Sequence, residues 1–259
     1  MTIANCLAVH EALQPITTRF VPTPACEVVE NVVKVNADHL EDSVRQIAKH
    51  GLPEMEALLA QPKIAALERQ INPTQKTVVF TSAIKGVVEP AAAALRRAGL
   101  SVFIHTGEEK TVDVAGQQIN TADLFIRDPA AQVLIASTGT LATGFDGLQK
   151  VANRMIFLTL PWTAADMEQA KARMVRQGTK FQQVEITTLS AVLNDSETGD
   201  EWGLDPQKLE IVNTKRSACD CVADGVIPEA AALKLSRDSV MRGLKKWQRR
   251  CAKQEAQAA

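Results

Sequence analysis

One stretch of the sequence, residues 132–186, constrains the fold more than any other. It begins with an apolar run at 133–137, continues through a loop punctuated by glycines, and reaches a second apolar run at 155–158. A segment with helical spacing follows at 164–177, and a third apolar run closes the stretch at 183–186. This order is typical of an α/β sheet whose strand ends present loops to a ligand.

The residues before this stretch extend the same pattern. An apolar strand pattern at 77–82 is followed by a helix expected to begin at Ser82 and to end at Ala98, and another strand pattern lies at 101–105. A strand, a helix and a strand of these lengths form a right-handed parallel unit. Residues 111–118, which follow it, read as a turn-rich stretch. We therefore predict a doubly wound parallel sheet with helices on both faces over residues 74–190.

The flanking regions differ in character from this central lobe. Residues 1–73 read as a linker segment that is mostly helical, with one β-branched strand pattern at 27–35 and a helix over 54–71 that we expect to break or kink at Pro62. Residues 191–259 contain an acidic loop, a short amphipathic piece around residues 204–212 and a basic helical tail. Neither flank forms a sheet of its own, so the fold expected is α/β with helical additions at both ends.

Composition limits the partners that the chain can have. With 259 residues, of which 46% are hydrophobic, the chain can bury a sizeable core. Its formal net charge of −1 means that any nucleic-acid binding must come from a local basic patch. Aromatic residues make up only 4% and include no Tyr, which argues against a base-stacking platform.

Cysteines and hydropathy indicate a soluble intracellular protein. Five cysteines lack the paired spacing of a zinc site, so we expect reduced thiols and no metal site. No leader-like start and no apolar run of about 20 residues is present, which favours a cytoplasmic location without membrane contact, or the nucleoid or nucleus if the protein is associated with DNA.

Two glycines, Gly139 and Gly144, have the spacing of a phosphate-binding loop but do not complete one. Such a loop needs Lys and then Ser or Thr directly after the second glycine, and here Phe145 and Asp146 follow. No strand ends in an Asp-Glu pair suited to Mg²⁺. This chain alone is therefore not expected to hydrolyse a nucleoside triphosphate.

Gln169, Arg173 and Arg176 are the strongest candidates for chemistry. Their spacing of four and then three positions places them close to one face of the predicted helix. A guanidinium in this position can stabilise charge on a transferring phosphoryl group. The alternative is a solvated basic helix face without a function, and the spacing alone does not exclude it.

These segments carry a family resemblance. Residues 78–80, 138–148 and 169–178 resemble, in order and spacing, motifs IV, V and VI of superfamily-two helicases. The sequences of residues 160–163 and 176–180 look most like those of the Swi/Snf-type branch. The resemblance is to the C-terminal, second RecA-like lobe and covers about residues 74–190. Residues 13–35 resemble the linker that follows the first lobe in that branch.

The resemblance implies roles for several residues. It implies that Arg176 is an arginine finger for the γ-phosphate, that Arg173 is a second phosphate contact, and that Gln169, Gly144 and Asp146 support the nucleotide site. The residues that it implies for nucleic-acid contact are Thr106, Gly107, Thr138 and Thr143, to which the basic tail adds Arg242, Lys245, Lys246 and Arg249. ATP and Mg²⁺ would be held mainly by a first RecA-like lobe that this chain lacks, and DNA is the expected partner.

Some features depart from the family pattern and leave alternatives open. Met174 and Val175 stand where the Swi/Snf-type branch has an Ala-His pair, and the missing first lobe means that catalysis cannot be complete here. One alternative is a non-catalytic module that binds DNA or a protein through the same fold. Another, a small-molecule transferase, lacks a recognisable nucleophile. Trp162 could stack on a base, although packing is the commoner role, and His105 reads as structural.

Overall fold

The protein is described by a computed structural model that covers residues 26–47, 51–114, 117–142, 146–194, 201–223, 242–246 and 248–249. The strands are β1 (Glu27–Asn36), β2 (Thr77–Thr81), β3 (Val102–His105), β4 (Thr111–Val114), β5 (Gln117–Asn120), β6 (Val133–Ser137), β7 (Arg154–Phe157), β8 (Gln183–Asn194) and β9 (Glu201–Trp202). The helices are η1 (Asp38–Leu40), α2 (Glu41–Ile47), α3 (Leu52–Gln70), α4 (Val88–Arg97), α5 (Thr121–Arg127), α6 (Thr138–Ala142), η2 (Leu148–Lys150), α7 (Ala164–Lys171) and α8 (Leu204–Ala223).

A parallel sheet forms the centre of the molecule. Its strands lie in the order β1-β8-β7-β2-β6-β3, and each neighbouring pair runs parallel. The short strand β9 adds to β8 in the antiparallel direction, and β4 and β5 form a separate antiparallel hairpin. The predicted parallel α/β sheet is therefore confirmed.

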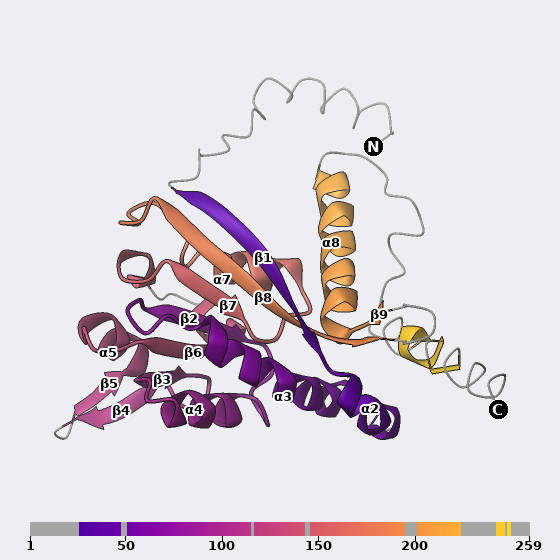
Figure 1. Ribbon diagram of the computed structural model, residues 1–259. Coiled ribbons are helices and arrows are strands. Elements are labelled where there is room, and N and C mark those ends of the chain that lie inside the picture. Colours follow the sequence, from indigo (N-terminus) through magenta and orange to yellow (C-terminus); the bar gives the residue numbers. More distant parts are fainter. Residues whose placement is uncertain are drawn as a thin grey trace, which may run out of the picture.

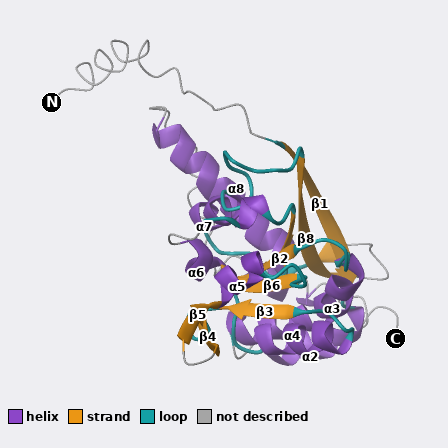
Figure 2. Cartoon of the chain, turned by 90° about the vertical axis from the view of Figure 1, so that its left-hand side faces the viewer, coloured by secondary structure: helices purple, strands orange, loops and turns teal. Residues whose placement is uncertain are grey.

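Helices cover both faces of this sheet because its central strands are apolar on both sides. In β2, Val78 and Phe80 belong to one core cluster and Val79 to another, as expected where successive side chains point to opposite faces. The first cluster packs against α5, α7 and α8, and the second packs against α3 and α4. Figure 2 shows this arrangement, with α3 and α4 on one side of the strands and α7 and α8 on the other.

The region that the sequence analysis set apart as a linker contributes to the layers of the lobe. β1 pairs with β8 along its whole length, from Glu27 opposite Gln183 to Asn36 opposite Val192 (Figure 1). α3 covers one face of the sheet as a single helix that contains Pro62, without the break that we expected. The physical reason is burial: Leu59, Ile64 and other residues on both sides of Pro62 pack into the core and hold the helix together.

Three further elements differ from the sequence-based expectation. The helix expected from Ser82 begins only at Val88, because the Ser82 hydroxyl donates to the carbonyl of Leu160 at 2.7 Å instead of capping a helix. Residues 111–118, expected to be turns, belong largely to the β4–β5 hairpin. α8 extends from Leu204 to Ala223, well beyond the short amphipathic piece expected there. In the part of the chain that the structure describes, no helix is long and apolar enough to cross a membrane.

Candidate functional site

Asp146 and Arg176 form an ion pair that joins two of the motif-like segments. The Asp146 Oδ1 and Arg176 Nη1 atoms lie 3.1 Å apart, and both side chains remain well exposed. Asp146 lies in the segment that leads into β7, and Arg176 lies in the segment that leads into β8. Because β7 and β8 are parallel neighbours, these segments meet at the amino edge of the sheet, not at the carboxyl edge where such a fold usually binds ligands.

Asp146 is held in place by its own loop. Its Oδ1 accepts hydrogen bonds from the Gln149 amide at 2.8 Å and from the Gly147 N–H at 2.9 Å. The hydrogen bond from Gln149 lowers the pKa of Asp146 most, and the positive charge of Arg176 lowers this pKa further. Gly147 has a φ of +114°, which a residue with a Cβ rarely adopts. The loop therefore presents a fixed carboxylate to Arg176.

Gln149 was not singled out from the sequence. It is only 2% exposed, and its Oε1 also accepts the Gly147 N–H at 3.0 Å, so one buried amide organises the whole turn. A polar residue three positions after a loop aspartate is a common pattern with many roles. The sequence offers no specific signal for this one.

The helix that carries Gln169 ends earlier than its spacing predicts. α7 stops at Lys171, and Arg173 and Arg176 lie in the turns that follow, so the three candidates do not share one helical face. Arg173 N–H donates to Ala170 and Met174 N–H donates to Lys171, three residues back, which tightens the chain. Gln169 is exposed and Arg173 is half-buried. The prediction of one helix through residue 177 was wrong, because the chain passes from α-helical bonding into these shorter turns before it reaches Gly178, which has a φ of +83°.

The other residues implied by the resemblance are dispersed. Thr106 and Thr138 are buried, with exposed fractions of 2% and 6%, and Thr106 accepts the N–H of Glu109 within its own turn. Neither hydroxyl is well placed to contact a nucleic-acid backbone from this conformation. Gly107 is exposed beside Thr106. Thr143 and Gly144 lie outside the described residues.

A hydrogen-bond network occupies the carboxyl edge of β2 and β7. The Thr159 hydroxyl accepts the N–H of Ser82 at 2.9 Å and that of Ala83 at 3.1 Å, and the Ser82 hydroxyl reaches Glu56 of α3. Lys208 of α8 donates to the same Glu56 carboxylate and, at 2.8 Å, to the carbonyl of Leu160. These polar groups hydrogen-bond to one another, so the network fills the space at this edge of the sheet.

A second buried ion pair lies beside this network. Lys63 Nζ bonds both carboxylate oxygens of Asp205 at 3.0 Å, and Asp205 also accepts the N–H of Ala191. Glu56 and Lys63 are seven residues apart on α3, and Asp205 and Lys208 are three apart on α8. Spacings of seven and three place each couple on one helical face, which is the sequence signal that could have revealed the two pairs.

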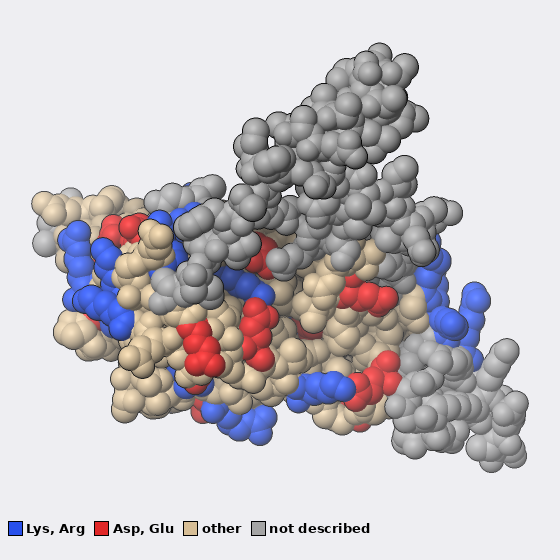
Figure 3. Space-filling model, turned by 90° about the horizontal axis from the view of Figure 1, so that it is seen from above, with Lys and Arg blue, Asp and Glu red and all other residues tan. Residues whose placement is uncertain are grey.

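The exposed basic residues of the tail lie far from Arg176. Arg242, Lys245, Lys246 and Arg249 are exposed in the helical residues 242–246 and 248–249. Leu244, between them, is buried in a cluster with Leu193 of β8 and Trp202 of β9. The tail therefore lies near the carboxyl end of β8, whereas Arg176 precedes its amino end, and the 12 residues of β8 span about 40 Å. One face of the molecule carries basic side chains at both ends, with acidic and further basic side chains between them (Figure 3).

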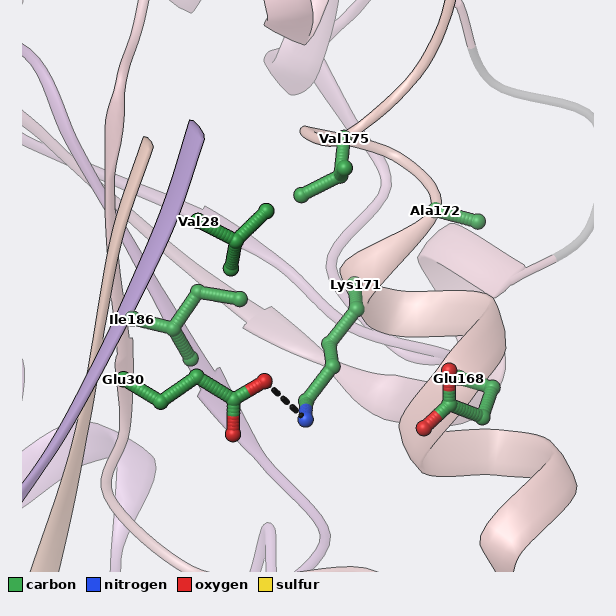
Figure 4. Close-up of a pocket in the computed structure, with 7 residues that line it drawn as sticks. All are labelled: Val28, Glu30, Glu168, Lys171, Ala172, Val175 and Ile186. Atoms are coloured by element: carbon green, nitrogen blue, oxygen red, sulfur yellow. Dashed lines mark hydrogen bonds and ion pairs between the residues drawn. The ribbon is translucent and has the colours of Figure 1, made fainter. Parts of the chain in front are cut away.

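A cavity of about 340 Å³ separates α7 from the edge of the sheet (Figure 4). Its apolar lining comes from Val28 of β1, Ile186 of β8 and Val175, and its polar side from Lys171, Glu168 and Glu30. Lys171 donates to Glu30 at 2.6 Å across this space. The cavity does not contain Arg176 or Asp146, so it is separate from the ion pair.

Trp162 and His105 have packing roles, in agreement with the commoner interpretation of each. Trp162 covers the buried ammonium of Lys208, which lies 4.4 Å from the ring centroid. His105 is 4% exposed, and its Nδ1 lies 2.9 Å from the Thr121 hydroxyl. Cys26 is a buried free thiol. Among the described residues, no cluster of His, Cys, Asp and Glu could hold a metal ion.

Comparison with known proteins gives a solved structure but no family. No protein-family model matches the chain. No curated protein matches it either. Among solved structures, the chain is similar to the C-terminal part of the Fun30 ATPase domain, with 17% sequence identity, a TM-score of 0.47, and coverage of 71% of this chain. The alignment covers 50% of that chain, so this chain spans about half the length of that protein.

Proposed function

We propose that this chain is the second lobe of an ATP-dependent DNA helicase or translocase, and that it supplies Arg176 to an ATPase site completed by a first lobe outside this chain. The observation that carries the proposal is the 3.1 Å contact between Arg176 and Asp146. The sequence resemblance assigns these two residues to motif VI and motif V, which are separate in the chain. Their convergence on a parallel α/β sheet supports that assignment.

The geometry suits a guanidinium that changes partners. The Arg176 side chain is 40% exposed, so part of the guanidinium faces solvent while Asp146 holds the rest. A phosphate group offers the same paired oxygens as a carboxylate, and a guanidinium binds either in a bidentate way. In the proposed site, Asp146 keeps Arg176 oriented until a first lobe brings a nucleotide phosphate to it. Arg173, half-buried three residues earlier, is the second phosphate contact in this proposal.

ATP and Mg²⁺ enter this proposal through the partner lobe. The residues described here fit contact with a terminal phosphate, through Arg176, but offer no group of carboxylates for the metal. When bound, ATP with Mg²⁺ would supply the hydrolysis that drives movement on DNA. The contribution of this chain is charge stabilisation at the phosphate and closure of the site.

The test uses reconstitution. The full chain is mixed with a candidate first lobe that carries a phosphate-binding loop and an Asp-Glu strand end, together with DNA, and ATP hydrolysis is measured. Arg176→Ala is expected to lower the rate by about 10³-fold or more, as for other arginine fingers. The matched control is Arg97→Ala, which removes an exposed arginine from α4 on the opposite face. An unchanged rate in Arg176→Ala, with a folded protein, refutes the finger assignment.

The alternative function is a non-catalytic DNA-binding module, favoured by the exposed basic tail. Because the tail and Arg176 lie at opposite ends of β8, their variants separate the two functions. In the alternative, the isolated chain binds DNA with an affinity that falls steeply with salt. Charge neutralisation at Arg242, Lys245, Lys246 and Arg249 would abolish this binding, while Arg176→Ala would leave it unchanged.

A further inference from the structure

Strand β1 forms one edge of the sheet in the part of the chain that the structure describes. Among the described residues it pairs only with β8, and it is the outermost strand in Figure 1. It is ten residues long, whereas β3 at the other edge has four. Val32, in the middle of β1, is 58% exposed, the largest value among the exposed large hydrophobic residues. A long edge strand with a central apolar residue is a template for another strand.

The hydrogen-bonding groups on this edge can be assigned from the pairing with β8. The Glu27 N–H donates to the Gln182 carbonyl at 2.8 Å, and the Ala37 N–H donates to the Val192 carbonyl at 2.8 Å. Odd-numbered residues of β1 therefore point their backbone groups toward β8. The even-numbered residues point theirs away from β8. The outward-facing residues, meaning those whose backbone N–H and C=O groups point away from β8, are Val28, Glu30, Val32, Lys34 and Asn36.

The charges on this edge are arranged symmetrically about Val32. Glu30 lies two residues before it and Lys34 two residues after it. If two copies of β1 meet antiparallel with Val32 opposite Val32, each Glu30 lies directly opposite a Lys34 of the other copy. Opposite charges in this cross-strand position stabilise an antiparallel pair, and like charges destabilise it.

Other registers lose this match. Centring the pair on Glu30 places glutamate opposite glutamate, and centring it on Lys34 places lysine opposite lysine. Centring the pair on Asn31 or on Val33 places Glu30 and Lys34 opposite apolar or neutral side chains. The Val32 register also aligns all five outward-facing residues, from Val28 opposite Asn36 to Asn36 opposite Val28. Hydrogen bonding and charge therefore select the same register.

The present partners of these charges leave them accessible. Glu30 accepts from Lys171 at 2.6 Å, as Figure 4 shows, and its side chain is still 55% exposed. Lys34 donates to Glu201 at 2.5 Å, and its side chain is 59% exposed. Exposed ion pairs of this kind are weak and can share a further partner.

We propose that β1 pairs antiparallel with β1 of a second copy of this chain, centred on Val32, so that two sheets join into one across a two-fold axis. Such an interface is isologous, because each copy contributes the same strand. The association does not depend on the proposed ATPase role.

The test exploits the charge symmetry. Glu30→Lys gives a strand with lysine at both positions, and Lys34→Glu gives one with glutamate at both. Each variant alone would face like charges and is expected to be monomeric, with a dissociation constant raised about tenfold or more. An equimolar mixture restores both opposite-charge pairs and is expected to form a heterodimer. Mass is measured by light scattering over a concentration series into the high micromolar range, where the wild type should reach twice 28.0 kDa.

Two controls make the outcome decisive. Lys85→Glu and Glu89→Lys reverse exposed charges near the start of α4 and should leave the dimer of the wild type unchanged. Val32→Pro removes an outward N–H that β8 does not use, so the fold should persist while the dimer is lost. A wild type that stays monomeric, or folded charge variants that stay monomeric when mixed, overturns the proposal. Slow amide exchange at Val32 in a monomeric wild type would show that the chain itself covers the edge, which also overturns it.

Discussion

The buried ion pair between Glu56 and Lys208 allows a test of what stabilises the hydrogen-bond network at the carboxyl edge of β2 and β7. The Lys208 side chain is fully buried and that of Glu56 is 9% exposed. Glu56→Leu removes the carboxylate to which Lys208 Nζ donates, and leaves the ammonium with the Leu160 carbonyl at 2.8 Å and the Trp162 ring at 4.4 Å. Breaking one half of a buried pair typically costs about 3–5 kcal/mol. The two remaining contacts place the expected loss at about 3 kcal/mol.

The double variant distinguishes charge from packing. Glu56→Leu with Lys208→Met replaces both charges by apolar groups of similar volume, and such replacements are often neutral or stabilising by about 1–4 kcal/mol. The free energy of unfolding would be measured by urea titration followed by circular dichroism. If the double variant is as unstable as the single one, the loss reflects packing, and the reasoning from charge burial is wrong.

A pH titration provides a second measurement on the same variants. Burial lowers the pKa of Lys208 below 10.5, and Glu56 opposes this shift. Without Glu56 the folded-state pKa falls further, so the unfolded chain binds more protons than the folded one below pH 10.5. The stability of Glu56→Leu should therefore rise with pH over this window more steeply than that of the wild type.

Two further predictions concern His105 and Gly147. Burial, followed by the charge of Lys110, lowers the pKa of His105 below 6.5, so the unfolded chain takes up a proton first and stability should fall as pH drops below 6.5. His105→Gln should flatten this part of the stability curve measured by thermal unfolding, and an unaltered slope would contradict the assignment. Gly147→Ala places a Cβ at φ +114° and 3.0 Å from Ile126 Cδ1, so it should cost about 1–3 kcal/mol in urea titrations. Gly107→Ala, which has no heavy atom within 4 Å of its new Cβ, is the matched control and should cost much less.

The sheet was predictable because its central strands are short apolar runs with no competing helical spacing. Residues 77–81 and 133–137 are buried at every position, which is the pattern of a strand covered on both faces. The strand character of β1 was also predictable from its β-branched residues. Its partner was not, because a parallel pairing with β8 leaves no local trace in the sequence.

The candidate site was predictable only in part. Spacing selected Arg176, and the resemblance selected Asp146, but nothing local indicated that the two would meet at the amino edge. The same spacing wrongly extended α7 to residue 177, because the buried Ala170 and Met174 keep helical spacing even though the backbone after Lys171 forms turns. Gln149, which fixes Asp146, was missed since its role depends on burial.

The pairing of the first strand with the last long one has a consequence for how the chain is made. Glu27 pairs with Gln183, so nearly the whole lobe must leave the ribosome before β8 is available to pair with β1. Until then its open backbone groups and valines are available to other chains. Contacts of such long range are slow to form, which makes the docking of β1 a late event in folding. A nascent chain stalled before residue 183 would contain β2, β3, β6 and β7 but not β8. Strand β1 would then have no strand to pair with and could not join the sheet.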